Sequence, residues 1–123
     1  MISSKQAGQF AASWIAAWNA HDLDRILQHY TDDFEMRSPK IAFFVGEPSG
    51  KLRGKAAVGA YWKRALELRP DLHFRLLEVC VGVDSVCLRY ESLDGKPAVE
   101  WFEFNDAFQI RRAAAHYGDA PLK

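Results

Sequence analysis

Few side chains in this sequence are placed to do chemistry. Its histidines show no spacing typical of metal ligands, so no metal site and no cofactor is expected. They are His21, His29, His73 and His116. Cys80 and Cys87 form no metal-ligand or disulfide framework and should be free thiols in a reducing compartment. If Glu100 lies in an apolar cavity, it is the best single candidate, because burial holds a carboxyl toward its neutral form and lets it exchange a proton near neutral pH.

The composition predicts one globular domain, residues 1–123, with a single core. Sixteen basic residues balance sixteen acidic ones without a basic cluster, which argues against nucleic acid or a membrane surface as partner. No run approaches the ~18 apolar residues of a membrane span, and the first 20 residues do not resemble a signal peptide, so a cytoplasmic protein is expected. Four Trp, eight Phe and four Tyr either make a Trp-rich core or leave some rings to line a cavity.

Helical patterns fill the first half of the chain. A capping box at Ser3 and Gln6 predicts a helix to about Ala20, and Asp22 caps a second apolar repeat that runs to Tyr30. Residues 54–69 predict a third helix. Between the second and third predicted helices, apolar and charged residues alternate over residues 34–38, which predicts a short strand that ends at Pro39. Residues 39–54 are predicted to form a long loop. The apolar run at residues 41–45 in this loop predicts that residues 41–51 form a lid or rim over a cavity.

Four strands joined by turns are predicted to follow, at residues 73–81, 86–92, 98–104 and 109–117. A two-residue loop at 83–84 sets Val79 against Leu88 on an apolar face, with Leu77 against Tyr90 further along it. A similar loop at 94–95 places Glu100 opposite Arg89 on the outer face.

Four motifs occur in order along nearly the whole chain: WIAAWNAHDLD from Trp14, YTDD from Tyr30, GKAAV from Gly54, and FND from Phe104 leading into RAAAHY. In this order they resemble the nuclear-transport-factor-2-like superfamily, or cystatin-like cone, and within it the SnoaL-like and ketosteroid-isomerase-like proteins. The resemblance implies an α+β fold in which three N-terminal helices pack on a curved, mostly antiparallel sheet. The helices and the sheet together form a cone with an internal pocket for an apolar small molecule.

Ketosteroid isomerases of this family hold an enolate oxygen with a Tyr and an Asp and move a proton with a second Asp. The resemblance places Trp14 at the Tyr position, Ser38 at the proton-moving Asp position, and Glu100 at the other Asp position. Steroid isomerisation by that mechanism is therefore not expected. The resemblance implies Glu100 as the catalytic group and a set of ligand-binding residues around it. They are Trp14, Trp18, Tyr30, Ser38, Trp62, Tyr90, Phe102 and Tyr117.

Two questions stay open at this point. The resemblance puts Glu100 inside the cone, whereas the strand register puts it outside, and a bulge near Pro97 would reconcile them. The function is either acid–base chemistry on an apolar carbonyl compound, such as isomerase, cyclase or hydrolase chemistry, or storage and sensing of a hydrophobic metabolite without catalysis. A purely structural partner domain is the third reading. A homodimer is expected through the outer face of the sheet, which is predicted to carry Phe74, Leu76, Cys80 and Cys87.

Overall fold

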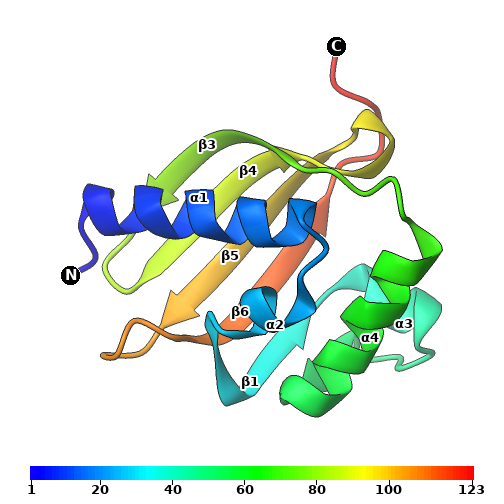
Figure 1. Ribbon diagram of the computed structural model, residues 1–123, viewed down its shortest axis with the longest axis horizontal. Helices are drawn as coiled ribbons and strands as arrows, with labels where there is room; N and C mark the ends of the chain where they lie inside the picture. The colour runs from blue at the N-terminus through cyan, green and yellow to red at the C-terminus, as the bar shows by residue number, and fades with distance from the viewer.

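The computed structural model describes all 123 residues as an α+β fold (Figure 1). The helices are α1 (Ser4–Asn19), α2 (Leu23–Leu27), α3 (Pro39–Phe44) and α4 (Lys55–Leu68), with the short 3-10 turn η1 (Leu93–Gly95). The strands are β1 (Tyr30–Arg37), β2 (Lys51–Arg53), β3 (Arg75–Val81), β4 (Ser85–Glu91), β5 (Pro97–Phe104) and β6 (Ile110–Tyr117).

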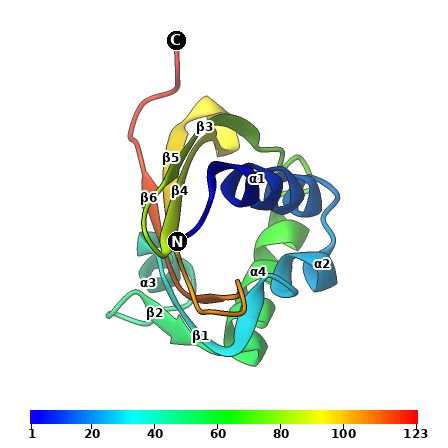
Figure 2. The same cartoon turned by 90° about the vertical axis from the view of Figure 1, so that its left-hand side faces the viewer.

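The six strands form one open sheet in the order β2-β1-β6-β5-β4-β3. Only β1 and β6 run parallel, and every other neighbouring pair is antiparallel. The sheet curves around α1, α2 and α4, which cover its inner face (Figure 2). The expected α+β cone is confirmed, and the core lies between these helices and the inner face.

The predicted helices form where their caps and apolar stripes indicated. Ser3 accepts from the backbone of Gln6 while the Gln6 side chain accepts from the backbone of Ser3, so the capping box at the start of α1 is complete. Asp22 caps α2 as expected, but α2 ends at Leu27. The prediction that this helix reaches Tyr30 was wrong, because the backbone is extended from Tyr30 and pairs with Ile110 of β6.

The segment predicted as an irregular loop contains α3 and β2. The Ser38 hydroxyl accepts from the backbone N–H of Lys40, and Pro39 occupies the first turn of α3, where a missing N–H costs nothing. Phe43, Phe44 and Val45 are 85%, 59% and 48% exposed. They lie at the surface and in no strand, as the lid or rim prediction requires.

The register of β3 and β4 follows the sequence arithmetic at Val79 with Leu88 and at Glu78 with Arg89. A bulge then makes Leu76, not Leu77, the partner of Tyr90. The register of β4 and β5 was wrong by one residue. Chain residues 92–96 form a five-residue connection around η1, so Glu100 lies opposite Leu88 and points to the inner face.

Asn19 ties the end of α1 to the segment entering β3. Its Nδ2 donates to the carbonyl of Phe74 at 2.9 Å, and its Oδ1 accepts from the N–H of Phe74 at 2.7 Å. Both backbone groups are left without these partners in Asn19→Ala. We expect this change to lower the free energy of unfolding by about 2 kcal/mol in urea denaturation. Asn19→Asp keeps the acceptor alone and should lose less; equal stability of all three proteins would contradict this role.

Candidate functional site

Glu100 is a carboxyl buried among aromatic rings on the inner face of β5. It is 3% exposed, and its neighbours across the sheet are Leu88 on β4 and Ala115 on β6. The Tyr90 hydroxyl donates to its Oε1 at 3.1 Å. The small side chain of Ala115 leaves room for the carboxyl, so the alanines of β6 serve packing on this face.

Burial is the main influence on this carboxyl, and it raises the pKa of Glu100 from 4.5 to about 7. The hydrogen bond from Tyr90 and the positive charge of Lys40 act in the opposite direction and only partly offset it. The phenols around Glu100 stay protonated, because burial raises the pKa of Tyr90 and Tyr117 and the Glu100 charge adds to the effect. Glu100 is thus a proton-exchanging group near neutral pH, surrounded by hydrogen-bond donors.

Most of the predicted ligand-binding residues lie in a packed aromatic core. Trp14 stacks on Phe74 with ring centroids 5.9 Å apart, and its Nε1 donates to the Tyr30 hydroxyl at 3.0 Å. Trp18 packs edge-on against Trp62 at 5.3 Å. The Nε1 of Trp18 is the only buried side-chain polar atom without a hydrogen-bond partner.

A pocket of about 520 Å³ opens beside this core, between α3, α4, the β4–β5 connection and the end of β6. Its walls carry apolar and basic side chains together. The lining residues used below are Lys40, Phe44, Tyr61, Arg64, Leu68, Arg69, Leu93, Asp94, Lys96, Tyr117 and Asp119. Of the nine residues predicted for the site, only Tyr117 lines this pocket. The role of the others in ligand binding stays a prediction.

Tyr61 and Tyr117 connect the pocket to the buried carboxyl. Both line the pocket, both phenols interact with the Ser38 hydroxyl, and the Glu100 charge acts on both. Burial raises the pKa of Tyr61 to about 12, so it too remains a donor. Lys40 lies over the Tyr117 ring, with Nζ 4.2 Å from the centroid. Tyr90 thus contacts Glu100, and Ser38 and Glu100 both influence the pKa of Tyr117, the one member of this group that lines the pocket.

Sequence reasoning missed Lys40, Arg64 and Lys96, which line the pocket from α3, α4 and the β4–β5 connection. Two of these three segments had been assigned as loop or tight turn. The signal that was present is the apolar run in residues 41–45, whose members Phe44 and Val45 do form part of the pocket wall.

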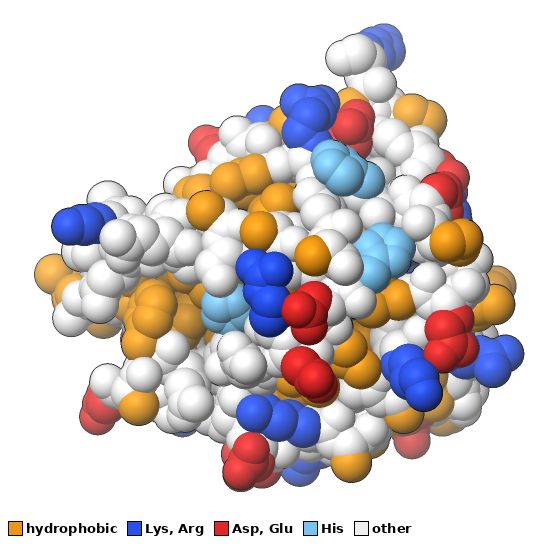
Figure 3. All heavy atoms as spheres, in the orientation of Figure 1, with side chains coloured by type: hydrophobic (Ala, Val, Ile, Leu, Met, Phe, Trp, Pro, Cys, Tyr) orange, Lys and Arg blue, Asp and Glu red, His pale blue; other side chains and the backbone are white.

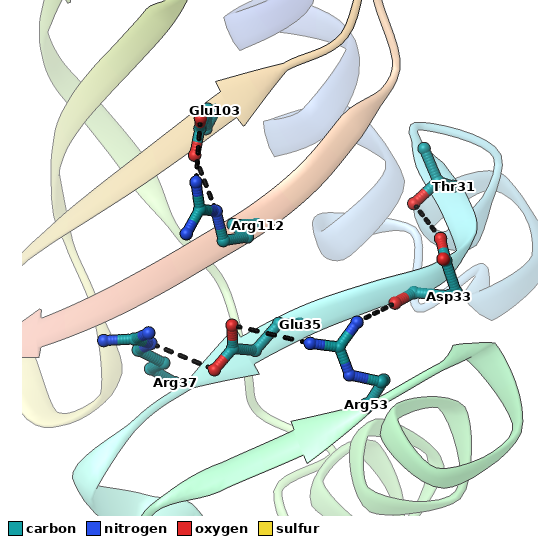
Figure 4. Close-up of polar contacts among 7 residues, drawn as sticks. All are labelled: Thr31, Asp33, Glu35, Arg37, Arg53, Glu103 and Arg112. Atoms are coloured by element: carbon teal, nitrogen blue, oxygen red, sulfur yellow. Dashed lines mark hydrogen bonds and ion pairs between the residues drawn. The ribbon is translucent and has the colours of Figure 1, made fainter.

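The outer face of the sheet is held by ion pairs. Glu103 on β5 accepts from Arg111 and Arg112 on β6, and the Arg112 Nε lies 2.8 Å from the Glu103 carboxylate. Glu35 on β1 pairs with Arg37 at 3.2 Å (Figure 4). On the helical side of the molecule, acidic and basic side chains are interspersed (Figure 3). No helix is long and apolar enough to cross a membrane, and no three His, Cys, Asp or Glu residues cluster as metal ligands would.

The homodimer remains a prediction, with a corrected surface. Phe74 and Leu76 do not belong to the outer face. The Phe74 ring is buried against Trp14, and Leu76 lies opposite Tyr90 on the inner face and packs against the core. The outer face instead offers Trp101 and Val99 beside Cys87, which is a free thiol like Cys80. We expect light scattering at micromolar concentration to give about twice 14.0 kDa, and Trp101→Glu to reduce it to one chain. A wild-type mass near 14.0 kDa would contradict the prediction of a dimer.

The solved structures that resemble this one include the following three. A SnoaL-like protein of unknown function from Burkholderia thailandensis is 52% identical with a TM-score of 0.94, over 96% of this chain and 98% of that one. A proposed isomerase of the SnoaL-like family from Agrobacterium tumefaciens is 15% identical with a TM-score of 0.75, over 94% and 99%. A protein of unknown function with a cystatin-like fold from Methylobium petroleophilum is 15% identical with a TM-score of 0.76, over 99% and 82%.

At 15% identity, the last two likenesses concern the fold alone. No functionally curated protein gives a significant match. The model of the SnoaL-like domain matches residues 11–114, which include the second half of α1, the strand carrying Glu100 and most of β6. The chain therefore belongs to the SnoaL-like domain family.

Proposed function

We propose that this protein binds an apolar carbonyl compound in the pocket beside Tyr61 and Tyr117 and that Glu100 moves a proton on it. The observation that carries the proposal is the Glu100 carboxyl, 3% exposed with a pKa raised to about 7, behind phenols that line a cavity of about 520 Å³. A carboxyl kept near its midpoint at neutral pH serves equally well as base and acid.

In the proposed step, the Glu100 carboxylate takes a proton from the carbon next to the ligand carbonyl. Electrons of the broken C–H bond move into the enolate, and the carbonyl oxygen accepts a hydrogen bond from a phenol of Tyr61 or Tyr117. Protonated Glu100 exchanges this proton with water and then protonates the same carbon or a conjugated one, which restores the carboxylate and leaves a solvent hydrogen on the ligand. Tyr90 remains as the donor that orients the carboxyl.

Because the Glu100 carboxyl is buried, one side chain must move before the carboxyl can reach a bound ligand. Tyr117 and Lys40 line the pocket whereas Glu100 does not, and Tyr117 is the last residue of β6, followed by a segment without regular structure. A ligand that displaces the Tyr117 ring exposes Glu100 with little cost to the sheet.

The test is deuterium incorporation from heavy water at the carbon next to the carbonyl, followed by proton NMR over a panel of apolar ketones. The proposal expects enzyme-dependent exchange in at least one ketone, together with amide shifts at Tyr61 and Tyr117 on binding. No exchange in any ketone that produces these shifts would overturn the catalytic proposal.

The second candidate is a binding protein without catalysis. The observation that favours it is that Glu100 is absent from the pocket wall, so a ligand filling the present cavity touches no proton-exchanging carboxyl. It predicts ligand-induced shifts at the pocket residues without any exchange in the same experiment.

A further inference from the structure

The pocket wall has an excess of positive charge that the whole chain lacks. Four basic residues line it, Lys40, Arg64, Arg69 and Lys96, against two acidic ones, Asp94 and Asp119. The chain as a whole has sixteen of each sign. The excess is therefore a property of this cavity and calls for a local explanation.

The structure uses only one of these four cations internally. Arg69 is held by Asp71 and Asp94, each 3.0 Å from its guanidinium, so it also occupies one of the two acidic groups. Lys40, Arg64 and Lys96 make no ion pair and no side-chain hydrogen bond. Three cations without an anionic partner thus line one cavity from three different segments.

Lys40 is the innermost of the three. It is half-buried over the Tyr117 ring, and its charged end lies near Arg69, Lys96, Asp94 and Glu100. Burial is the main cause that lowers the pKa of Lys40, and the like charges of Arg69 and Lys96 lower it further. An anion at this point would relieve that repulsion.

Apolar walls complete the cavity. Phe44 and Leu68 belong to α3 and the end of α4, and Leu93 belongs to the β4–β5 connection. Phe44 and Leu68 are 59% and 56% exposed, which is more than a surface with no occupant favours. A ligand that matches this wall has an apolar body and one negatively charged end.

We propose that the pocket's ligand is an amphipathic carboxylate, whose anionic end lies among Lys40, Arg64 and Lys96 and whose apolar body reaches inward to Tyr61 and Tyr117. This deepens the function proposed above and rests on it, since it specifies an apolar carbonyl compound that also carries a carboxylate. The positive charge of the pocket wall fixes the orientation of the ligand, so that its carboxylate end enters last. The ligand carbonyl is then presented to the phenols and to Glu100 behind them.

The probes are keto acids with a benzoyl group at the end of propanoate, butanoate or pentanoate, each compared with its methyl ester. Each methyl ester keeps the apolar body and the ketone of its acid and lacks only the negative charge. We expect at least one acid to bind about tenfold or more tightly than its ester in calorimetry, with the difference shrinking as salt rises. Deuterium exchange next to the ketone is measured on the same pairs.

Arg64→Gln and Lys96→Gln test the assignment of the charged end. Both side chains are exposed and unpaired, so these changes should leave folding intact. Each should weaken binding of the acid by about three- to tenfold and leave ester binding within about twofold. Lys63→Gln is the matched control, an exposed cation next to Arg64 on α4 that does not line the pocket, and it should change neither affinity.

The outcomes separate the two proposals. Acid binding that depends on Arg64 and Lys96 but gives no exchange supports the ligand class and overturns the catalytic role. Exchange with equal affinity for acid and ester keeps the catalytic role and overturns the ligand class. Binding of none of the three acids, or acid binding unaffected by both substitutions, also overturns it.

Discussion

Glu100→Gln is expected to reduce deuterium exchange on a bound ketone by about 10²- to 10⁴-fold, the range that a general base contributes. Glutamine keeps the shape of the side chain and an oxygen that can accept from Tyr90, but it has no group that titrates near neutral pH. Ligand affinity should stay within about tenfold, a change under ~1.4 kcal/mol, because the proton-moving group acts mainly in the transition state.

Glu78→Gln is the control for this change. Glu78 lies on the outer face of β3, where it pairs with Arg89 at 3.3 Å, and both side chains are about half exposed. An exposed pair of this kind contributes little to stability, and it lies on the opposite side of the sheet from the pocket. Exchange by Glu78→Gln should equal wild type. If Glu100→Gln keeps wild-type exchange and the same pH profile, Glu100 is not the base.

A second variant separates the carboxyl from the phenol in front of it. Tyr117→Phe removes the hydroxyl of a pocket-lining phenol and keeps the ring under Lys40. It should lower the exchange rate without moving the pH midpoint, since the titrating group is Glu100. The two variants therefore change different features of the same pH profile.

The fold was predictable because its local signals agree. The capping box at Ser3, the stripe of Phe10, Trp14 and Trp18, and alternation along the last four strands each specify an element that the structure contains. The parallel pairing of β1 with β6 was not predictable in this way, because residues 30–37 and 110–117 are far apart in sequence and no local pattern encodes their contact.

The orientation of Glu100 shows how the length of a short connection determines which face of the sheet a side chain lies on. An Asp-Gly pair is the usual signal of a two-residue hairpin, and that loop would have sent Glu100 to the outer face. Asp94 and Gly95 do adopt positive φ, at 61° and 72°, but inside a five-residue connection. One residue of register then turned the carboxyl inward, as the family resemblance had implied.

The candidate site was only partly predictable because aromatic residues serve core and cavity alike. Trp14 and Phe102 are fully buried against each other, with ring centroids 5.2 Å apart. A sequence gives no local distinction between a ring that packs and a ring that lines a pocket. The basic residues of the pocket wall come from three segments, and only the tertiary fold brings them together.

The stability of the protein should depend on pH through Glu100, and the direction is fixed by its raised pKa. The pKa is about 7 in the folded protein and 4.5 for an unperturbed Glu, so folded Glu100 keeps its proton between these values while the unfolded chain has lost it. Stability from this group is complete below about pH 4.5 and falls as pH rises toward 7. At pH 8 the loss approaches about 3 kcal/mol.

Glu100→Gln removes this titration, so its stability relative to wild type should increase by about 2.5 kcal/mol from pH 5 to pH 8 in urea denaturation. The phenols that face Glu100, those of Tyr30, Tyr61, Tyr90 and Tyr117, have raised pKa values and stay neutral over this range. Lys40, the facing cation, acts on Glu100 only through its charge.

Comparison with Glu78→Gln makes the measurement specific. That variant lacks an exposed carboxyl, so its stability should run parallel to wild type from pH 5 to pH 8. A constant difference between Glu100→Gln and wild type would mean that the Glu100 carboxyl titrates like an exposed one. The protein would then lack the neutral-pH acid on which proton transfer in this pocket depends, and binding without catalysis would become the better account of its function.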